Sequence, residues 1–341
     1  MHIGIAFDLK ADFLAESARP REGRAGELPD DLLEEYDSDA TVSAIERVLT
    51  ARGHRVTRLG GGRRFLENLL RERVDLVFDI AEGRGSRSRE AHVPAACEML
   101  GVPCTHSDPL TMAVTLDKAM AKRVVASAGV PTPGFVVVER PTDLARVAFP
   151  FPLFAKPLFE GSSMGIRRRS RIANAAELAE RVGALLHDYG EPVLVEEFCA
   201  GAEFTVGIRG NGETARVIGT MEVEPLLVPR EQFVYSLEVK RNPNWAEEIS
   251  YNVPPKRARA EVERVEKVAL DAYRALGCRD IARIDVRCDA AGDPKFIECN
   301  PLPGVAPGWS DLSILWDRLG GNYDTMIGAI LDEACARLEL A

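Results

Sequence analysis

Two segments near the end of the chain have the pattern of a β-hairpin whose polar side chains share one face. Residues 281–288 and 295–300 alternate with a period of two, and the turn-forming sequence DAAGDP separates them. A simple antiparallel register places Cys288 opposite Lys295. In that register, an acidic side chain of one strand faces an acidic side chain of the other.

The facing acids are Asp285 and Glu298, and Arg283 faces Asn300 beside them. Two carboxylates placed directly opposite each other repel. A cation between them removes the repulsion, and carboxylate and amide oxygens are the ligands that Mg²⁺ prefers. The pattern therefore predicts either a metal site formed by Asp285, Glu298 and Asn300 or a hairpin at a sheet edge, where solvent weakens the repulsion.

A lysine and a loop of small residues form a second candidate site. Lys156 follows the apolar run PLFA and precedes the loop EGSSMG at 160–165. Glycines let backbone N–H groups turn toward an anion, serines add hydroxyl donors, and the lysine adds positive charge. The segment is not a Walker A motif, since no lysine follows its glycines. It predicts a phosphate-binding loop, with a flexible surface turn as the alternative.

Three glutamates beside a predicted strand form a third candidate site. Glu196 and Glu197 lie near the end of the strand at 193–198, and Glu203 begins the next strand. Such a group could bind the hydroxyls of a ligand. The alternative, which charge alone favours, is a set of solvated glutamates.

The composition is that of an acidic globular enzyme. The chain has 341 residues and a formal net charge of −10, so it is long enough for two or three domains and lacks the broad basic surface of a nucleic-acid-binding protein. No apolar stretch approaches the ~18–20 residues that span a bilayer, and the N-terminus does not have the pattern of a signal peptide. The seven cysteines are scattered without a metal-binding spacing. Free thiols suit a reducing compartment, so we expect a cytoplasmic protein.

The first 110 residues alternate between predicted strands and helices, which predicts a mainly parallel, doubly wound sheet. The predicted elements lie at 3–7, 39–52, 54–58, 74–79, 89–100 and 101–105. Ser38 or Asp39 is expected to cap the first of these helices. Residues 8–37 are charged and contain two prolines, so we expect a long loop, and loops of this length are often functional.

Two further α/β units are expected after this first one. Their predicted elements are a helix at 116–129, strands at 135–139 and 153–156, a helix at 174–189, strands at 193–198 and 203–208, an irregular segment at 225–255, and helices at 258–276 and 323–338 around the hairpin. We therefore divide the chain into domains at 1–110, 111–192 and 193–341.

The order of these motifs resembles that of the ATP-grasp superfamily, and specifically that of D-alanine–D-alanine ligase and its relatives. The matching segments are Leu116-Asp117-Lys118, Lys156-Pro157 with 160–165, 195–198 with 201–206, 276–278 with 282–286, and 298–301 with 303–304. The resemblance covers the chain from about residue 75 onward. It implies an α/β ATP-grasp fold of three subdomains, with ATP between the central and the C-terminal one.

The resemblance also implies roles for the matching residues. The residues expected to bind ATP are Lys118 and Lys156 at the phosphates and adenine, Lys240 at the γ-phosphate, Glu196, Glu197, Phe198 and Cys199 around the adenine, Glu203 at the ribose, and Ser162 and Ser163 in a mobile loop over the phosphates. Two Mg²⁺ ions, replaceable by Mn²⁺, would be held by Asp285, Glu298 and Asn300. Arg283, Lys240 and Ser163 would be catalytic, with Arg283 stabilising the charge that develops on the acyl-phosphate.

The part expected to bind the other substrates departs from the family pattern. Glu82-Gly83 stands where the family has His-Gly, and Arg241 follows Lys240 where the family prefers tyrosine. The residues expected to contact the substrates are Glu82, Arg241, Gly304, Trp309 and Ser310. Glu82 should favour a cationic group, and the alternative is that it pairs with a nearby arginine at 84, 87 or 89.

We therefore expect an ATP-dependent ligase that joins the carboxylate and amine of small amino-acid-like molecules through an acyl-phosphate, with a specificity other than for two D-alanines. A true D-alanine–D-alanine ligase, a nucleotide-binding protein without turnover and an ATP-grasp enzyme of different chemistry are the alternatives. We also expect a homodimer with neither nucleic acid nor a membrane as partner.

Overall fold

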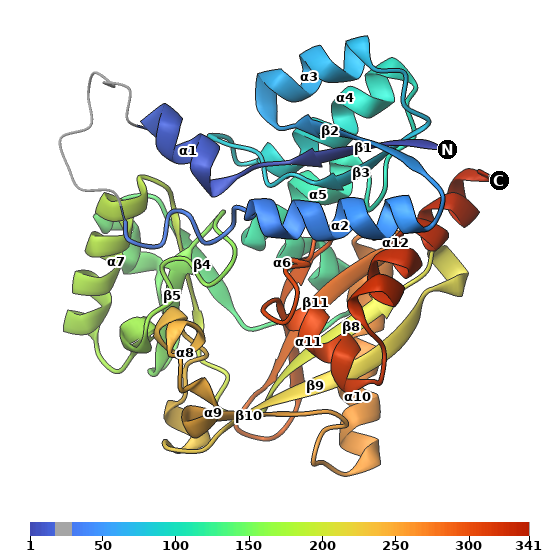
Figure 1. Cartoon of the computed structure of the whole chain (residues 1–341). Helices are drawn as coiled ribbons and strands as arrows, with labels where there is room; N and C mark the ends of the chain where they lie inside the picture. Colours follow the sequence, from blue (N-terminus) through green and yellow to red (C-terminus); the bar gives the residue numbers. More distant parts are fainter. Residues whose placement is uncertain (18–28, 341) are drawn as a thin grey trace.

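The N-terminal part of the chain folds around a parallel sheet with the strand order β2-β1-β3 (Figure 1). The computed structural model describes residues 1–17 and 29–340. The elements of this part are β1 (His2–Phe7), α1 (Lys10–Ser17), α2 (Asp39–Ala51), β2 (Arg55–Gly60), α3 (Gly62–Arg71), β3 (Leu76–Ile80), the 3₁₀ helix η1 (Arg89–Ala91), α4 (His92–Leu100) and α5 (Pro109–Leu116). Helices α3 and α4 lie on one side of the sheet and α2 lies on the other, as the alternation of strands and helices predicted (Figure 1).

Two expectations for this part need correction. The strand expected at 101–105 is reduced to a single bridge between Val77 and Cys104. The segment 8–37, expected to be a loop, begins with α1, and residues 18–28 of it lie outside the described residues. Helix α1 could not be predicted from the sequence, because its residues are largely charged and have almost no amphipathic pattern.

Helix α2 shows how the sequence fixes an element of this layer. The Ser38 side chain accepts a hydrogen bond from the backbone N–H of Thr41, which satisfies a donor at the start of the helix. The apolar side chains at helical spacing are buried against β1 and β3, and they are Val42, Ile45, Val48 and Leu49. The expected cap and core face are thus confirmed.

The central part contains an antiparallel sheet with the order β4-β7-β5-β6. Its elements are α6 (Lys118–Ser127), β4 (Phe135–Val138), β5 (Leu153–Pro157), β6 (Arg171–Ile172), α7 (Ala175–Tyr189) and β7 (Val193–Glu197). The helix expected at 116–129 begins only at Lys118, because the Asp117 side chain caps it and α5 ends before it. Strand β7 pairs within this sheet, although it follows the boundary expected at residue 192.

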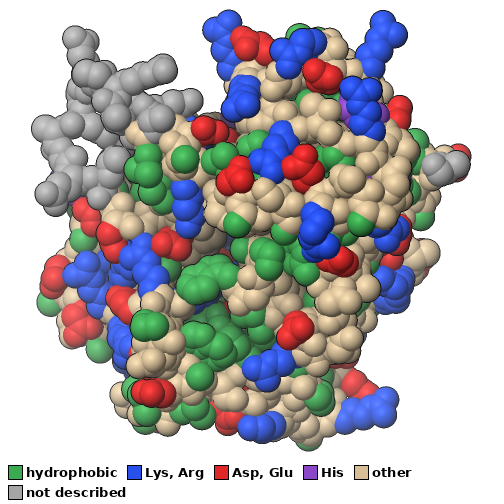
Figure 2. Space-filling model, in the orientation of Figure 1, with side chains coloured by type: hydrophobic (Ala, Val, Ile, Leu, Met, Phe, Trp, Pro, Cys, Tyr) green, Lys and Arg blue, Asp and Glu red, His purple; other side chains and the backbone are tan. Residues whose placement is uncertain are grey.

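The C-terminal part is built on a second antiparallel sheet, with the order β10-β9-β8-β11-β12. Its elements are β8 (Glu203–Arg209), β9 (Arg216–Pro225), α8 (Leu237–Arg241), α9 (Trp245–Glu248), β10 (Ile249–Asn252), α10 (Arg259–Ala275), β11 (Ile281–Cys288), β12 (Pro294–Asn300), α11 (Asp311–Arg318) and α12 (Tyr323–Leu338). Hydrophobic side chains of α10 and α6 form one core with β8, β11 and β12. Figure 2 shows hydrophobic side chains gathered in the middle of one face, between α8 and α9 on one side and α11 on the other.

The hairpin of β11 and β12 has the predicted register at the end that carries the candidate metal ligands. Asp285 lies opposite Glu298, and Arg283 lies opposite Asn300. The pairing shifts by one residue beyond Asp285, so that Cys288 faces Pro294 rather than Lys295. A β-bulge causes this shift, which a simple period-two register does not anticipate.

The last helix returns to the N-terminal sheet, and Figure 1 shows the two ends of the chain close together. Hydrophobic side chains of α12 share a core with those of α2, β1 and β3. Arg337 of α12 lies 2.8 Å from the fully buried Asp280, whose carboxylate also accepts a hydrogen bond from the backbone N–H of His106. These contacts fix the N-terminal layer on the C-terminal one.

Candidate active site

A narrow cleft between the central and C-terminal sheets collects most of the residues expected to bind a nucleotide. Its walls come from strands β5 and β7 on one side and from β8, β11 and β12 on the other. The expected residues that line it are Lys156, Ser163, Glu196, Glu197, Phe198, Cys199, Glu203, Lys240, Arg283, Asp285 and Glu298. Segments that are distant in sequence therefore meet in one place.

A buried carboxylate between two lysines lies at this cleft. Glu196 is 2.8 Å from Nζ of Lys122 and 3.1 Å from Nζ of Lys156, and all three side chains are buried. Burial alone would raise the pKa of Glu196, but the two ammonium groups outweigh it and lower the pKa. Lys122 was missed by the sequence reasoning, although it lies one helical turn after Lys118 on α6, where residues four apart share a face.

The same wall carries an aromatic pair, which a cation and an acid of the opposite wall approach. The rings of Phe154 and Phe198 stack with centroids 6.3 Å apart, and the guanidinium of Arg287 lies 4.6 Å from the centroid of Phe198. Arg287 also lies 3.2 Å from Glu203. The carboxylate of Glu197 accepts a hydrogen bond from the backbone N–H of Gly134. This bond fixes the segment just before β4 at the edge of the cleft.

The candidate metal ligands converge at the end of this cleft. Asp285 accepts hydrogen bonds from Thr205, Arg283 and the amide of Asn300, at 3.0, 3.0 and 3.3 Å. One buried oxygen of Glu298 has no hydrogen-bond partner, and Lys156 lies 3.6 Å from it. Two carboxylates and an amide oxygen are a donor set that suits Mg²⁺, although no group of three acidic, histidine or cysteine ligands occurs among the described residues.

The charges around Glu298 keep it ionised. Burial would raise its pKa, but Lys156, Lys118 and Arg283 outweigh burial and lower the pKa to about 2. Burial raises the pKa of Asp285. The positive charge of Arg283 lowers this pKa, and repulsion by Glu298 raises it further. The pair therefore has the mutual repulsion that the hairpin register predicted, and a cation between the two would relieve it.

Arg283 and Lys240 meet at one carboxylate that the sequence reasoning missed. Asp311, at the start of α11, lies 3.3 Å from Arg283 and 3.5 Å from Lys240, and it accepts a hydrogen bond from the hydroxyl of Tyr235. Nothing in the local sequence links these residues, because they come from β11, α8, α11 and the segment before α8.

The Ser/Gly loop (residues 160–165) lies over the cleft in a constrained conformation. Ser162 and Ser163 have φ of 46° and 62°, which is uncommon for residues other than glycine. Such a conformation persists only where surrounding contacts impose it. The contacts come from the segment at 29–37, here called the acidic strap.

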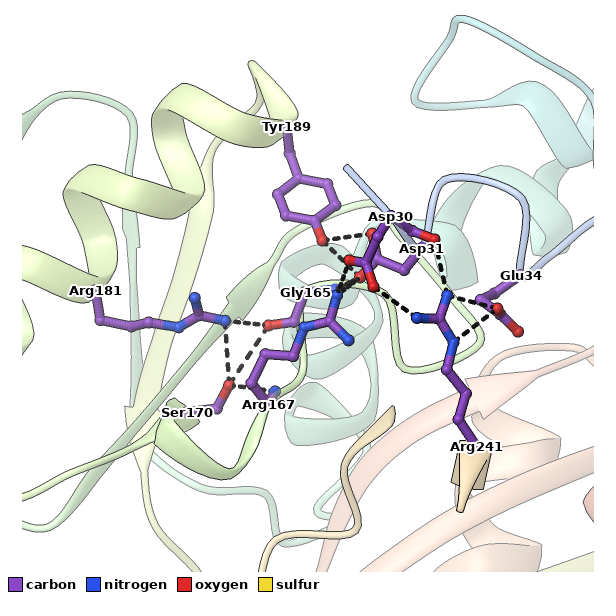
Figure 3. A network of polar contacts seen from close by, with 9 residues as sticks. All are labelled: Asp30, Asp31, Glu34, Gly165, Arg167, Ser170, Arg181, Tyr189 and Arg241. Carbon is purple, nitrogen blue, oxygen red and sulfur yellow. Dashed lines mark hydrogen bonds and ion pairs between the residues drawn. The ribbon is translucent and has the colours of Figure 1, made fainter. Parts of the chain in front are cut away.

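Asp31 of the acidic strap is fully buried and holds the end of the Ser/Gly loop (Figure 3). Its carboxylate accepts hydrogen bonds from the backbone N–H of Gly165 at 2.9 Å, the hydroxyl of Tyr189 at 2.8 Å and the guanidinium of Arg167 at 2.9 Å. Gly165 has a φ of +66°, and a Cβ there would lie 2.4 Å from Pro157. Both the position and the conformation of the loop thus depend on this site.

Arg241 contacts the acidic strap instead of the substrate cavity in which it was expected. Its guanidinium lies 2.6 Å from Asp30 and 2.7 Å from Glu34 (Figure 3), and it does not line the cavity next to the cleft. A second contact of the strap joins Glu35 to Arg89 at 2.7 Å. The acidic strap therefore links the N-terminal layer to the Ser/Gly loop and to α8.

A larger cavity of about 620 Å³ adjoins the narrow cleft, which is here called the nucleotide cleft after the residues expected in it. The expected residues on its walls are Glu82, Lys118, Ser162, Lys240, Arg283, Glu298, Asn300, Gly304, Trp309 and Ser310. Lys118 donates a hydrogen bond to the backbone carbonyl of Glu160. Ser310 lies so close to Gly304 that a side chain at 304 would meet its hydroxyl.

The two cavities meet where their walls share the same side chains. Lys240, Arg283 and Glu298 line both, as do Tyr235 and Asp311. A group transferred from one cavity to a molecule in the other would pass two cations at this junction.

Glu82 does not form the ion pair that was the alternative to a substrate contact. Arg89 pairs with Glu35, Arg87 lies 3.8 Å from Asp117, and Arg84 contacts Asp8. Within the part of the chain that the structure describes, no arginine pairs with Glu82. Burial raises the pKa of Glu82 well above its usual range.

Comparison with known proteins identifies the family. The family model for the D-ala D-ala ligase C-terminus matches residues 124–332. The D-alanine–D-alanine ligase of Bordetella avium is 32% identical over 264 residues, which are 77% of this chain and 78% of that protein. The chain belongs to the D-alanine–D-alanine ligase family. It is thus an ATP-dependent C–N ligase that forms ADP, as the motif order predicted.

Further comparisons agree on the fold of the ligase. The structure of D-alanine–D-alanine ligase from Bacillus anthracis, complexed with ATP, superposes with a TM-score of 0.71 at 18% identity and covers 100% of both chains. VanG D-Ala:D-Ser ligase from Enterococcus faecalis gives a TM-score of 0.69 at 19% identity, over 98% of this chain and 100% of that one. "Uncharacterized protein y4sG" of Sinorhizobium fredii is 30% identical over 88% of each chain. The expected ATP-grasp fold is confirmed.

Two other expectations bear on the environment of the ligase. No helix among residues 1–17 and 29–340 is long and apolar enough to cross a membrane. The seven cysteines, which all lie within the described residues, are free.

Proposed function

We propose that the ligase joins two small amino-acid-like substrates through an acyl-phosphate, and that this pair is not two D-alanines. The observation that supports the reaction is the junction of the two cavities. The nucleotide cleft and the larger cavity share Lys240, Arg283 and Glu298, so a phosphoryl group in one is adjacent to a carboxylate in the other.

The chemistry follows from these positions. A carboxylate oxygen of the first substrate attacks the γ-phosphorus of ATP, the bond from that phosphorus to the β-phosphate oxygen breaks, and ADP leaves. The amine of the second substrate then attacks the acyl carbon, the bond to the phosphate oxygen breaks, and the amine loses a proton as the amide forms. Arg283 and Lys240 stabilise the negative charge of both transition states, since preformed cations in a water-poor site are effective in this role.

A divalent cation fits the residues at this junction. The donors would be Asp285, Glu298 and the amide oxygen of Asn300, and the unpartnered oxygen of Glu298 is the group that such an ion would satisfy. Mg²⁺ bound there would supply charge neutralisation on the phosphates.

The nucleotide cleft must open to admit ATP. Its volume of about 80 Å³ is well below the ~300 Å³ at which small-molecule pockets begin. The segment at 225–255 was expected to be irregular, but it contains α8, α9 and β10. It contacts the chain directly after the Ser/Gly loop, since the backbone N–H of Leu237 in α8 donates to the carbonyl of Ile166. We infer that these two segments move together and close over ATP, which excludes water from the acyl-phosphate.

The substrate cavity supports a specificity other than for D-alanine. Glu82 places an uncompensated acid on its wall, where it would favour a cationic group. Relatives of the same fold include one named as a D-Ala:D-Ser ligase, so this fold accommodates more than one substrate pair. The second candidate is D-alanine–D-alanine ligase proper, which the name of the Bordetella avium relative favours.

Phosphate release from ATP across amino acids of both hands, offered singly and in pairs, tests the proposal. We expect release to require an amino acid pair and to be slow with D-alanine alone, and Glu298→Gln serves as the inactive control. Brisk release with D-alanine alone would establish the second candidate. Failure of every pair to stimulate release would contradict the proposed reaction.

A further inference from the structure

The larger cavity has an acidic wall that takes no part in the bond-making steps of the proposed reaction. Five carboxylates line it from the N-terminal part: Glu34, Glu35 and Asp37 of the acidic strap, Glu82 after β3, and Glu90 in η1. Within the described residues, Glu34 pairs with Arg241 and Glu35 pairs with Arg89, and the other three acids have no ion pair. The acids of this wall therefore outnumber the ion pairs that the described residues offer them.

Glu90 is the most informative of the five. It is 9% exposed and lines the cavity, and its side chain has neither a hydrogen bond nor an ion pair among the described residues. The pKa of Glu90 is raised to about 7, mainly by burial. The positive charge of Arg89 lowers this pKa, and the negative charge of Glu35 raises it. Burying an acid without a partner is unfavourable, so a ligand group that supplies the partner would be bound preferentially.

The cations nearest to this wall are already engaged. Arg89 lies 2.7 Å from Glu35 and 3.3 Å from Glu160. Lys118 donates to a backbone carbonyl, and Lys10 is the cation that acts on Asp37. Glu82 and Glu90 remain as two acids that act on each other and that no cation of the described chain pairs with.

The number of charges distinguishes between substrates. An amino acid that donates its carboxylate has one α-ammonium, and the amine that attacks must be neutral when it reacts. One α-ammonium therefore compensates one of the two remaining acids. We propose that one of the two amino-acid substrates has a second cationic group, an ammonium or guanidinium on its side chain, held by Glu82 and Glu90. This inference rests on the proposed ligase function and names its substrate class.

Pairs of amino acids that differ only in the side-chain charge provide the test. Lysine is compared with norleucine, and ornithine with norvaline, in both hands, with arginine as a separate arm. We expect the cationic member to have a kcat/KM about 100-fold or more above its neutral counterpart, because a site built for a charge discriminates strongly against an analogue that lacks it. Equal or better turnover of the neutral members would overturn the proposal.

Matched variants assign the effect to the wall. Glu82→Gln and Glu90→Gln keep the size of each side chain and should each reduce the preference for the cationic member about 10-fold or more. Glu67→Gln, an exposed acid on α3 that pairs with Arg63, should leave the preference unchanged. An unchanged preference in both cavity variants would contradict the assignment even if cationic substrates are used.

Calorimetry separates this inference from the proposed function. The same amino acids are titrated into the ligase with Mg²⁺ and a non-hydrolysable ATP analogue, so no turnover is required. Tighter binding of lysine or ornithine than of its neutral counterpart, lost in Glu90→Gln, supports the second cationic group even if no amide forms. Equal binding, or no binding of either, overturns it.

Discussion

A single substitution at Asp31 should show most clearly how much more a buried contact contributes to stability than an exposed one. Its carboxylate is fully buried and holds Gly165, Arg167 and Tyr189 at once. The neighbouring Asp30 also contacts Arg167, but its side chain is 67% exposed. The two residues are adjacent in sequence and share a partner, so they form a matched pair for comparison (Figure 3).

The size of the expected loss in stability follows from the burial of Asp31. Removing one member of a buried, hydrogen-bonded charge pair costs about 3–5 kcal/mol, because the partners stay buried without compensation. We therefore expect Asp31→Ala to lower the free energy of unfolding by about 3–5 kcal/mol. Asp31→Asn retains one acceptor oxygen and should lower it by about 2 kcal/mol. For Asp30→Asn we expect about 0–1 kcal/mol, as for other exposed ion pairs.

Two measurements check this reasoning. Urea unfolding gives the ranking of the three variants, and hydrogen exchange of the peptide that contains Gly165 reports the local contact, because the Gly165 N–H donates to Asp31. We expect protection of this amide to fall in both Asp31 variants and to be retained in Asp30→Asn. Equal destabilisation by Asp30→Asn and Asp31→Ala, or unchanged protection of Gly165, would refute the role of Asp31.

Three further predictions follow from the site. Glu298→Gln should reduce turnover by about two orders of magnitude or more, because even residues that only support a metal ligand contribute about 10–100-fold. The midpoint of urea unfolding should stay near that of the parent protein. Retained turnover would exclude Glu298 from the site. Proteolysis within 160–165 and 225–255 should slow when an ATP analogue is added, and equal cleavage with and without it would contradict closure. Burial lowers the pKa of His106 to about 4, so its neutral form favours the folded state above pH ~6.5, and this contribution decreases as the pH falls toward 4. His106→Asn should therefore reduce the stability difference between pH 7 and pH 4.5 by about 2–3 kcal/mol, and an unchanged difference would contradict the shift.

The sequence predicted those parts of the fold and site that depend on local patterns. The period-two alternation of β11 and β12 was sufficient to place Asp285 opposite Glu298, because side-chain direction in a strand is set by position alone. The shift that moves Cys288 away from Lys295 was not predictable, since a bulge depends on how the hairpin pairs with its neighbours. Strand β9 was missed as well, and Gly219 in its interior weakens the strand pattern.

Contacts between distant segments explain the remaining differences. Arg241 stands where the family prefers tyrosine, which suggested a contact with the substrates, yet its partners Asp30 and Glu34 lie more than 200 residues away in the chain. Lys122 and Asp311 complete the charges around the cleft, but only the packing of α6 and α11 brings them there. Ion pairs of this kind have no signature in local sequence.

Transfer of an oxygen atom from substrate to phosphate tests the central claim most directly. The amino acid that stimulates phosphate release is supplied with ¹⁸O in its carboxylate, together with ATP and its amine partner, and the inorganic phosphate is examined by mass spectrometry. The acyl-phosphate route predicts one ¹⁸O in each phosphate released, in proportion to the amide formed. Amide formation with unlabelled phosphate would contradict it, because the carboxylate oxygen would then never have been bonded to phosphorus.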